Sequence, residues 1–278
     1  MDAEFEASPV DRILAARLGP LCNSFAWPAL RPLLHALIGR KAAIALCQSL
    51  APLDSRDVFE WLIDRLELKL TTTGLEQIPR YGPCLAVANH PTGAADGVAL
   101  YQALRPHRPD ICFFSSVEAL EIAPGLAPCL IPVQIDTARR TPSCQRALAQ
   151  ALRAAIRAER LIVLLPAGAL SLPHGAALRD PPWAPTPVQL ARRFELPVIP
   201  IHIAARNSAL HYALLRLSPR LRDLTVFREL VNKRRTRFRV TIGTPIPADR
   251  LPASDIDAIT QLFDEVHQHL AQPTALPD

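Results

Sequence analysis

The sequence predicts an α/β fold: a mostly parallel central sheet flanked by helices, with a helical region before it. Two observations support this prediction. After about residue 66, short apolar runs alternate with longer amphipathic ones, and the short runs are apolar throughout, as in strands buried on both faces of a parallel sheet. The chain has 278 residues, 49% hydrophobic and 21% charged, which is enough for one sizeable core. We therefore expect a helical region over residues 1–66 and one α/β domain over residues 67–278.

The N-terminal region has helical spacing interrupted by prolines. Apolar residues recur every three or four positions, and Pro20, Pro28 and Pro32 break the pattern. The stretch from Phe25 to Leu50 is rich in leucine and alanine and contains few charges. It fits two arrangements equally well: a helix pair lying in a bilayer interface, or helices packed on the protein's own core.

Five short apolar runs after residue 66 have the length and the flanking residues of strands. They are Leu85–Ala88, Ile111–Phe114, Leu161–Leu165, Val198–Ile203 and Phe238–Ile242. Four stretches show helical periodicity. They are Val98–Leu104, Arg146–Ala158, Pro187–Phe194 and Asp255–Leu270. The proline-rich stretch from Pro173 to Pro187 is expected to be a loop beside the active site, because structureless loops in compact domains are usually functional.

Composition restricts the partners and the compartment. The net charge of +5 comes almost wholly from arginine, since the chain has only three lysines. Such a surface favours anions: phospholipid headgroups, cofactor phosphates, an acidic carrier protein or nucleic acid. Nucleic acid is not expected, because aromatic residues do not interleave with the basic ones and no known binding motif occurs. The sequence has no apolar run long enough for a membrane span and no secretory signal, so we expect a cytoplasmic protein.

Two further features of the sequence concern the surface and the cysteines. The stretch from Arg220 to Arg237 alternates apolar and basic residues, which is typical either of a surface that binds an anionic membrane or an acidic carrier protein, or of an ordinary basic surface helix. The six cysteines are scattered, with no CxxC pair and no histidine cluster. They predict reduced, mostly buried thiols and no metal site.

The stretch most suggestive of chemistry follows the run Leu85–Ala88. Asn89 and His90 enter a turn made of proline, threonine and glycine, and Asp96 begins a helical run. A histidine at the carboxyl end of a strand lies where open α/β sheets bind ligands. His90 could act as a general base, with Asp96 holding its imidazole in the required tautomer. On spacing alone, a histidine with an aspartate six residues later is weak evidence for catalysis, and a turn histidine with Asp96 as a helix cap is the commoner arrangement.

Further motifs follow in a fixed order along the chain. They are Asn-His-Pro-Thr-Gly-Ala-Ala-Asp-Gly at 89–97, Ile131–Asp136 followed by Arg139 and Arg140, Leu-Pro-Ala-Gly at 165–168, the strand Leu196–Ile203, and Arg-Glu-Leu at 228–230. With these motifs, the chain resembles the lysophospholipid acyltransferase superfamily, and within it the hemolysin-like branch. The resemblance covers roughly residues 68–247.

The resemblance implies an enzyme of lipid metabolism and phospholipid biosynthesis. Such an enzyme transfers a fatty acyl group from acyl-CoA or acyl carrier protein to a hydroxyl or amine of a lyso-lipid or lipid precursor. His90 would be the general base and Asp96 would orient it. The enzyme would be peripheral at the inner face of the membrane, with an anionic membrane surface as a partner. It would need no metal and no cofactor besides the acyl thioester, which is a co-substrate.

The resemblance also suggests residues that contact substrate. They are Asn89, Thr92, Gly93, Arg139, Arg140, Pro166 and Gly168. The backbone N–H groups around Thr92 and Gly93, or those beside Gly168, are candidate donors to the oxyanion. The two arginines could bind a phosphate or carboxylate, or could be a solvated basic pair. Ala167 replaces the glutamate of the superfamily's Phe-Pro-Glu-Gly block and no arginine follows it, which argues against a lysophosphatidate acceptor.

Two other functions remain open. One is a thioesterase or lysolipid hydrolase. The sequence has no Gly-x-Ser-x-Gly motif to supply a serine nucleophile, so His90 would have to activate water directly. The other is a non-catalytic lipid-binding protein of the same fold, because fold does not fix activity. The presence of both His90 and Asp96 argues against this last reading.

Overall fold

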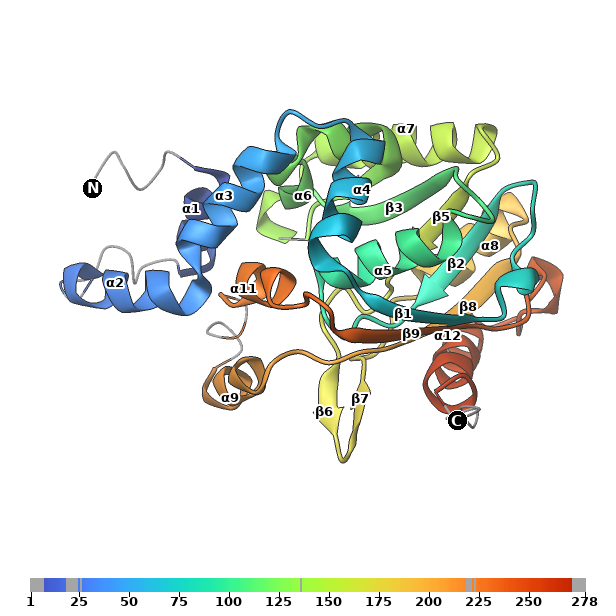
Figure 1. Ribbon diagram of the computed structural model, residues 1–278. Helices are drawn as coiled ribbons and strands as arrows, with labels where there is room; N and C mark the ends of the chain where they lie inside the picture. Colours follow the sequence, from blue (N-terminus) through green and yellow to red (C-terminus); the bar gives the residue numbers. More distant parts are fainter. Residues whose placement is uncertain are drawn as a thin grey trace.

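The computed structural model describes residues 8–18, 25, 27–135, 137–218, 222 and 224–271. Within these residues, seven strands form one sheet in the order β1-β9-β8-β2-β5-β3-β4 (Figure 1). Their bounds are β1 Lys69–Thr73, β2 Cys84–Ala88, β3 Ile111–Ser116, β4 Leu130–Val133, β5 Leu161–Leu164, β8 Val198–Ala204 and β9 Arg237–Ile242. Strands β8, β2, β5, β3 and β4 are mutually parallel; β9 is antiparallel to β8 and parallel to β1. The predicted, mostly parallel sheet is confirmed.

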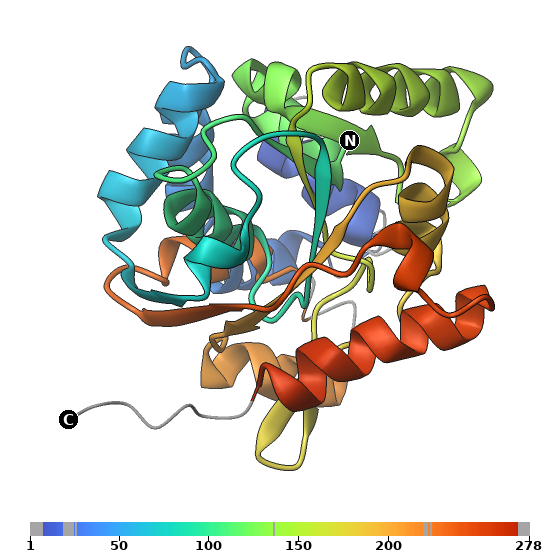
Figure 2. The same ribbon diagram turned by 90° about the vertical axis from the view of Figure 1, so that its right-hand side faces the viewer.

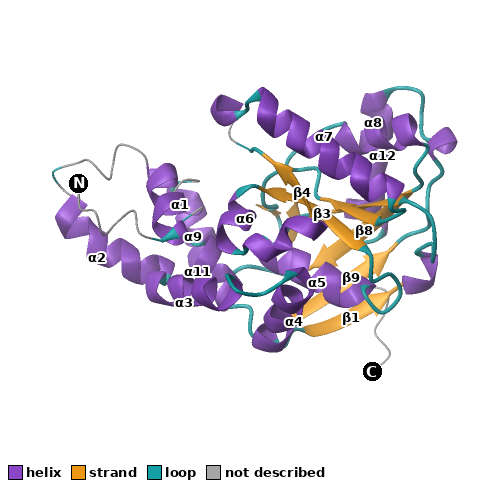
Figure 3. Ribbon diagram, turned by 90° about the horizontal axis from the view of Figure 1, so that it is seen from above, coloured by secondary structure: helices purple, strands orange, loops and turns teal. Residues whose placement is uncertain are grey.

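Helices cover both faces of the sheet (Figure 3). On one face lie α7, α8 and α12, and on the other lie α4 and α5. Their bounds are α4 Ser55–Leu66, α5 Ala94–Leu104, α7 Pro142–Arg157, α8 Thr186–Phe194 and α12 Asp255–Asp264, which a π-helical turn, Glu265–His269, continues (Figure 2). Alternate residues of β2 serve the two cores, with Leu85 on the α7 side and Ala86 on the α5 side. All five residues of β2 are buried, as a central parallel strand requires.

Two edge strands were missed in the sequence for a physical reason. β4 contains Pro132, which has no N–H to give to a ladder and is tolerated because β4 is the last strand of the sheet. β1, at the other edge, is half exposed and rich in threonine, so it lacks the apolar character of the central strands.

The proline-rich stretch from Pro173 to Pro187 is not an irregular loop. It contains a two-stranded antiparallel hairpin, β6 (Leu172–His174) paired with β7 (Ala177–Arg179), which projects from the domain in Figure 1. The turn of the hairpin is Gly175-Ala176, with Gly175 at φ 60°. A hairpin this short has no long apolar alternation, so periodicity did not reveal it.

The N-terminal helices are α1 (Pro9–Leu18), α2 (Trp27–Ile38) and α3 (Arg40–Leu50). Together with α11 (Val226–Val231) they enclose a small core of their own. Its buried members are Val10, Ile13, Leu14, Leu34, Ile38, Ala43, Cys47, Leu224 and Phe227. Other residues of α3, such as Leu46 and Leu50, join α4 in the main core. The helices of residues 9–66 are thus shared between two cores.

Helix α1 is attached to the carboxyl edge of the parallel strands through α6 (Glu118–Ile122), which closely follows β3. Arg17 pairs with Glu118 at 2.7 Å, and Arg12 lies 3.6 Å from Glu121. Exposed ion pairs of this kind contribute little energy, but they show where α1 lies. The N-terminal helices therefore lie beside the edge at which ligands bind in such sheets.

Many residues of the basic stretch from Arg220 to Arg237 make contacts within the protein. Arg220, Leu221 and Asp223 lie outside the described residues. Phe227 is buried in the N-terminal core, and Lys233 is buried against Glu229 at 2.9 Å. Arg234 and Arg235 both bind Glu67. Leu224 and Phe227 pack with residues of α2 and α3 in the N-terminal core.

Four cysteines, Cys47, Cys84, Cys112 and Cys129, are buried free thiols, as expected; Cys144 is partly exposed, and Cys22 lies outside the described residues. Burial raises the pKa of the Cys84 thiol to about 11. Among the helices of the described ranges, none has both the length and the apolar character needed to cross a bilayer.

Candidate active site

The parallel strands bring the sequence motifs to one edge of the sheet. His90 follows β2, Gly168 follows β5, and Arg139 follows β4, each at the carboxyl end of its strand. β2 pairs directly with β5 on one side and β8 on the other, so the turns after these three strands are neighbours. This edge is where open α/β sheets bind ligands.

Asp96 is the most heavily hydrogen-bonded group of this edge. Its side chain is fully buried, on the first turn of α5. Its Oδ2 accepts from His90 Nδ1 at 2.9 Å, from the Thr92 N–H at 2.9 Å and from the Gly93 N–H at 3.0 Å. Its Oδ1 accepts a short hydrogen bond from the Thr92 hydroxyl. The carboxylate thus fixes both the turn and the ring of His90.

These contacts determine the chemistry of His90. Since Asp96 accepts at Nδ1, the neutral ring carries its proton there and keeps a lone pair on Nε2. Nε2 makes no hydrogen bond with any described residue, and the side chain is 20% exposed. His90 is therefore held in the tautomer of a general base, with the basic nitrogen free to meet a ligand.

Two predicted oxyanion donors are already used. The N–H groups of Thr92 and Gly93 both donate to Asp96, so neither is available to a substrate. The prediction that they bind an oxyanion is wrong. Gly93 is needed for another reason: its φ of 98° and ψ of −139° lie in a region that only glycine enters readily. This conformation turns the N–H of Gly93 towards Asp96.

Asn89 does not face a substrate. It is buried, its Nδ2 donates to the Ile203 carbonyl at 3.0 Å, and its Oδ1 accepts from the Ile203 N–H at 2.6 Å. The side chain thus continues the β2–β8 ladder one residue beyond the end of β2. The predicted substrate contact is wrong, and Asn89 instead fixes the point at which the chain leaves the sheet towards His90.

Replacing Asn89 with alanine is expected to destabilise the fold by about 2–4 kcal/mol, because the buried N–H and carbonyl of Ile203 both lose their partner. Urea unfolding measures this loss. The control is Asn232→Ala at an exposed position, which should change stability little. Wild-type stability combined with a raised KM would contradict this structural role and indicate that Asn89 contacts substrate.

The Leu-Pro-Ala-Gly block lies against the His90 turn. The Ser171 N–H donates to the His90 carbonyl at 2.8 Å, and Leu170 approaches Gly93. Gly168 has φ 59°, a left-handed conformation that glycine adopts without steric cost. The Gly168 N–H donates to the Leu165 carbonyl, whereas those of Ala169 and Leu170 make no hydrogen bond within the described residues. Pro166, buried, accepts from the Ala184 N–H and stiffens the start of this turn.

Sequence reasoning missed Asp180, a second buried carboxylate beside His90. Its Oδ1 accepts from the His90 N–H at 3.2 Å and from the Ser171 hydroxyl, and its Oδ2 accepts from Trp183 Nε1 at 2.9 Å. Burial would raise the pKa of Asp180, but His267 and the Ser171 and Trp183 donors outweigh it and lower that pKa. Asp180 is therefore ionised at neutral pH. No spacing rule links it to His90, which is 90 residues away.

The two predicted arginines lie farther from His90. Arg139 and Arg140 are exposed on the turn after β4, and β5 and β3 separate them from β2. Arg140 donates to the Gln134 carbonyl at 3.0 Å. His202, on β8, is largely buried, and this burial with the nearby His267 lowers the pKa of its ring to about 4, so it is neutral at neutral pH.

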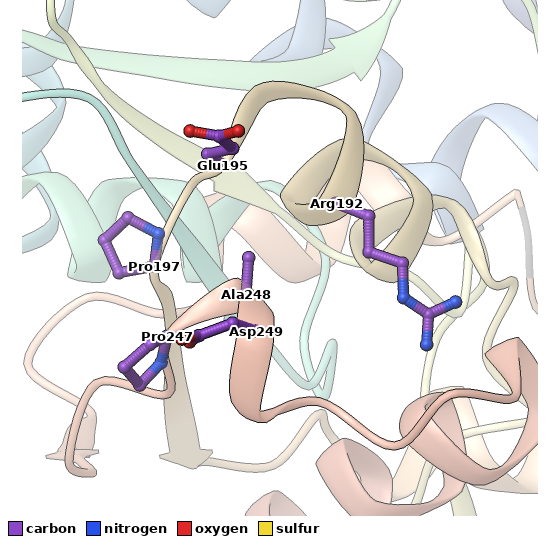
Figure 4. A pocket seen from close by; sticks show the side chains of 6 residues that line it. All are labelled: Arg192, Glu195, Pro197, Pro247, Ala248 and Asp249. Atoms are coloured by element: carbon purple, nitrogen blue, oxygen red, sulfur yellow. The ribbon is translucent and has the colours of Figure 1, made fainter.

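A pocket of about 520 Å³ lies elsewhere (Figure 4). It is lined by Arg192, Glu195, Pro197, Pro247, Ala248 and Asp249. Pro197 immediately precedes β8, so this pocket is at the amino edge of the parallel strands, opposite His90. The assignment of the active site therefore depends on side-chain chemistry and not on cavity size.

Comparisons with known proteins agree on one family. The Acyltransferase family model matches residues 69–204. A lyso-glycine lipid O-acyltransferase of Phocaeicola vulgatus is 32% identical over 197 residues, 69% of each chain. Its counterpart in Bacteroides thetaiotaomicron is 28% identical over 197 residues, 69% of this chain and 71% of the relative.

A solved structure shares the fold. It is the 1-acyl-sn-glycerophosphate (LPA) acyltransferase PlsC from Thermotoga maritima, with a TM-score of 0.53 and 15% sequence identity. The match covers 95% of this chain and 98% of the other. At this identity the likeness concerns the fold alone.

Proposed function

Because this chain belongs to the lysophospholipid acyltransferase superfamily and is an acyltransferase of lysolipids, we propose that it transfers a fatty acyl group from an acyl thioester to the hydroxyl of a lyso-lipid, with His90 as general base. One observation carries the proposal: Asp96 holds His90 at 2.9 Å through Nδ1, and at the carboxyl edge of the sheet Nε2 has no hydrogen-bond partner among the described residues. A thioester is already activated, so a base, its orienting carboxylate and oxyanion donors are sufficient.

The proposed reaction has two steps. Nε2 of His90 takes the proton of the acceptor hydroxyl as its oxygen attacks the thioester carbonyl carbon, which forms a C–O bond and a tetrahedral oxyanion. Asp96 stabilises the imidazolium that results. The intermediate then collapses, the C–S bond breaks, and the imidazolium returns its proton to the leaving thiolate. The products are the acylated lipid and a free thiol.

The oxyanion needs donors that are free and close to His90. The N–H groups of Ala169 and Leu170 make no hydrogen bond within the described residues, so they are free to donate. The hydrogen bond from the Ser171 N–H to the His90 carbonyl joins this turn to the His90 turn, which supports their closeness to His90. We propose these two groups as the oxyanion donors, in place of Thr92 and Gly93.

The acceptor is proposed to be a lyso-lipid hydroxyl like that of the relatives, which are named for a lyso-glycine lipid. The block beside His90 reads Ala167, Gly168, Ala169 and Leu170, without a charged side chain that could bind an acceptor phosphate. Arg139 and Arg140 lie three strand spacings from β2, roughly 14 Å. There they are proposed to bind phosphate or carboxylate on a distant part of a substrate, such as the donor's carrier.

Purified protein tests this function directly. It is given acyl-CoA or acyl carrier protein thioester with a lyso-glycine lipid or with lysophosphatidate, and the products are identified by mass. We expect O-acylation of the lyso-glycine lipid and little or none of lysophosphatidate. Free fatty acid formed at the same rate without any acceptor would support the hydrolase, and no turnover of either thioester would support the lipid-binding protein.

Docking to a membrane is proposed for α2. The exposed face of this helix carries no charge. It consists of Pro28, Ala29, Pro32, Leu33 and Ala36. Leu33 is 68% exposed. α2 shares the N-terminal core with α1, which α6 attaches to the carboxyl edge of the sheet. An apolar helix face there would place His90 near a bilayer that supplies lipid acceptors.

Leu33→Glu is expected to weaken binding to anionic vesicles by about tenfold or more, because it removes an exposed apolar group and adds a repelled charge. Vesicle sedimentation measures binding. Turnover of an acceptor dispersed in detergent should not change. The matched control is Ile256→Glu on α12, where an equally exposed side chain lies on another part of the surface. Equal losses in both variants would contradict docking through α2.

A further inference from the structure

We propose that Asp180 is a positioning residue that fixes the main chain of His90, as Asp96 fixes its ring. This inference rests on the proposed role of His90 as the base. It assigns the His90 loop two separate supports, one from the start of α5 and one from the segment after the β6–β7 hairpin.

Asp180 and Ser171 hold the His90 peptide groups from both ends. The His90 N–H donates to Asp180 Oδ1 at 3.2 Å, and the His90 carbonyl accepts from the Ser171 N–H at 2.8 Å. The Ser171 hydroxyl donates to the same Oδ1, which closes the loop between the two supports. A shift of Asp180 would therefore move both ends of His90.

The carboxylate of Asp180 is itself rigidly placed. Its side chain is fully buried, and Trp183 Nε1 donates to Oδ2 at 2.9 Å. His267, on the π-helical turn, lies 3.7 Å from Oδ2 and packs on the rings of Trp183 and Phe263. Burying a charged carboxylate costs free energy unless its oxygens accept hydrogen bonds. The donors to Asp180 therefore keep its side chain in this position.

A base displaced by about 1 Å loses on the order of 10²-fold in rate. Asp180→Ala is therefore expected to lower kcat by on the order of 10–10²-fold with little change in KM for either substrate. Asp180→Asn retains an acceptor for the His90 N–H and should recover part of the loss. Trp183→Phe removes only the far anchor of the carboxylate and should show a smaller loss of the same kind.

The matched control is Asp110→Asn. Asp110 is bound to Arg108 and immediately precedes β3, at the amino edge of the sheet. This variant should keep the wild-type kcat. Rates are taken per folded protein, with folding checked by thermal melting. If Asp180→Ala does not fold, Asp180→Asn decides: a wild-type kcat, or a raised KM with unchanged kcat, overturns the proposal.

A second measurement does not depend on turnover. In ¹⁵N-labelled protein, the His90 amide proton is expected to exchange with solvent at least tenfold faster in Asp180→Ala or Trp183→Phe than in wild type. An unchanged exchange rate in both variants overturns the proposal. If wild type and Asp110→Asn transfer no acyl group, the proposed function fails, and this exchange rate still decides the role of Asp180.

Discussion

Replacing His90 with alanine is expected to lower the rate of acyl transfer by about 10²–10⁴-fold, the usual contribution of a general base. Stability should change by less than about 1 kcal/mol, because the ring is partly exposed and its one hydrogen bond within the described residues is to Asp96. Asp96 would still accept from the N–H groups of Thr92 and Gly93. Steady-state kinetics and thermal melting measure the two effects separately.

The control for this variant is His269→Ala. His269 also pairs with a carboxylate, Glu265 Oε2 at 2.7 Å, but it is exposed on the π-helical turn. Its removal should leave the rate unchanged. Transfer at the wild-type rate in His90→Ala would exclude His90 as the base. Equal losses in the two variants would indicate that the assay reports folding.

Asp96→Asn is expected to lower turnover by about 10³–10⁴-fold, the effect of the equivalent change in a serine protease triad, where the imidazole is left in the wrong tautomer. Here Oδ2 accepts three hydrogen bonds at once. An amide cannot reproduce these contacts at both atoms, so a stability loss of about 2–3 kcal/mol accompanies the loss of rate. The measurement is kcat per folded protein, with urea unfolding alongside.

Thr92→Val separates the two roles of Asp96. It removes the hydroxyl that donates to Oδ1 and leaves every contact of Oδ2, including that with His90. This variant should lose stability with a far smaller loss of rate. If both variants lose the same rate for the same loss of stability, Asp96 acts only as the helix cap that its spacing also allowed.

The fold and the pairing of His90 with Asp96 could be predicted because their signals are local. β2 is apolar throughout because it is central, and His90 and Asp96 are six residues apart in one turn. The likeness to known acyltransferases supports the proposal that this pair is catalytic. Edge strands were missed because partial exposure and Pro132 remove the apolar pattern.

The supports of the site could not be predicted because they join distant residues. Asn89 bonds to Ile203, 114 residues away, and Asp180 to His90, 90 residues away. The use of the Thr92 and Gly93 N–H groups by Asp96 is a matter of turn geometry, which composition and motif order do not specify. Residues that hold the His90 turn therefore appear only when the sheet and its turns are assembled.

The most direct test of the central claim is the stoichiometry of products in a single reaction. Wild-type protein is mixed with an acyl thioester and a lyso-glycine lipid, and free thiol and acylated lipid are measured together. We expect one acylated lipid for each thiol released, and thiol release that falls at least tenfold when the acceptor is omitted. Thiol released at an equal rate without acceptor, with free fatty acid as its partner, would contradict it.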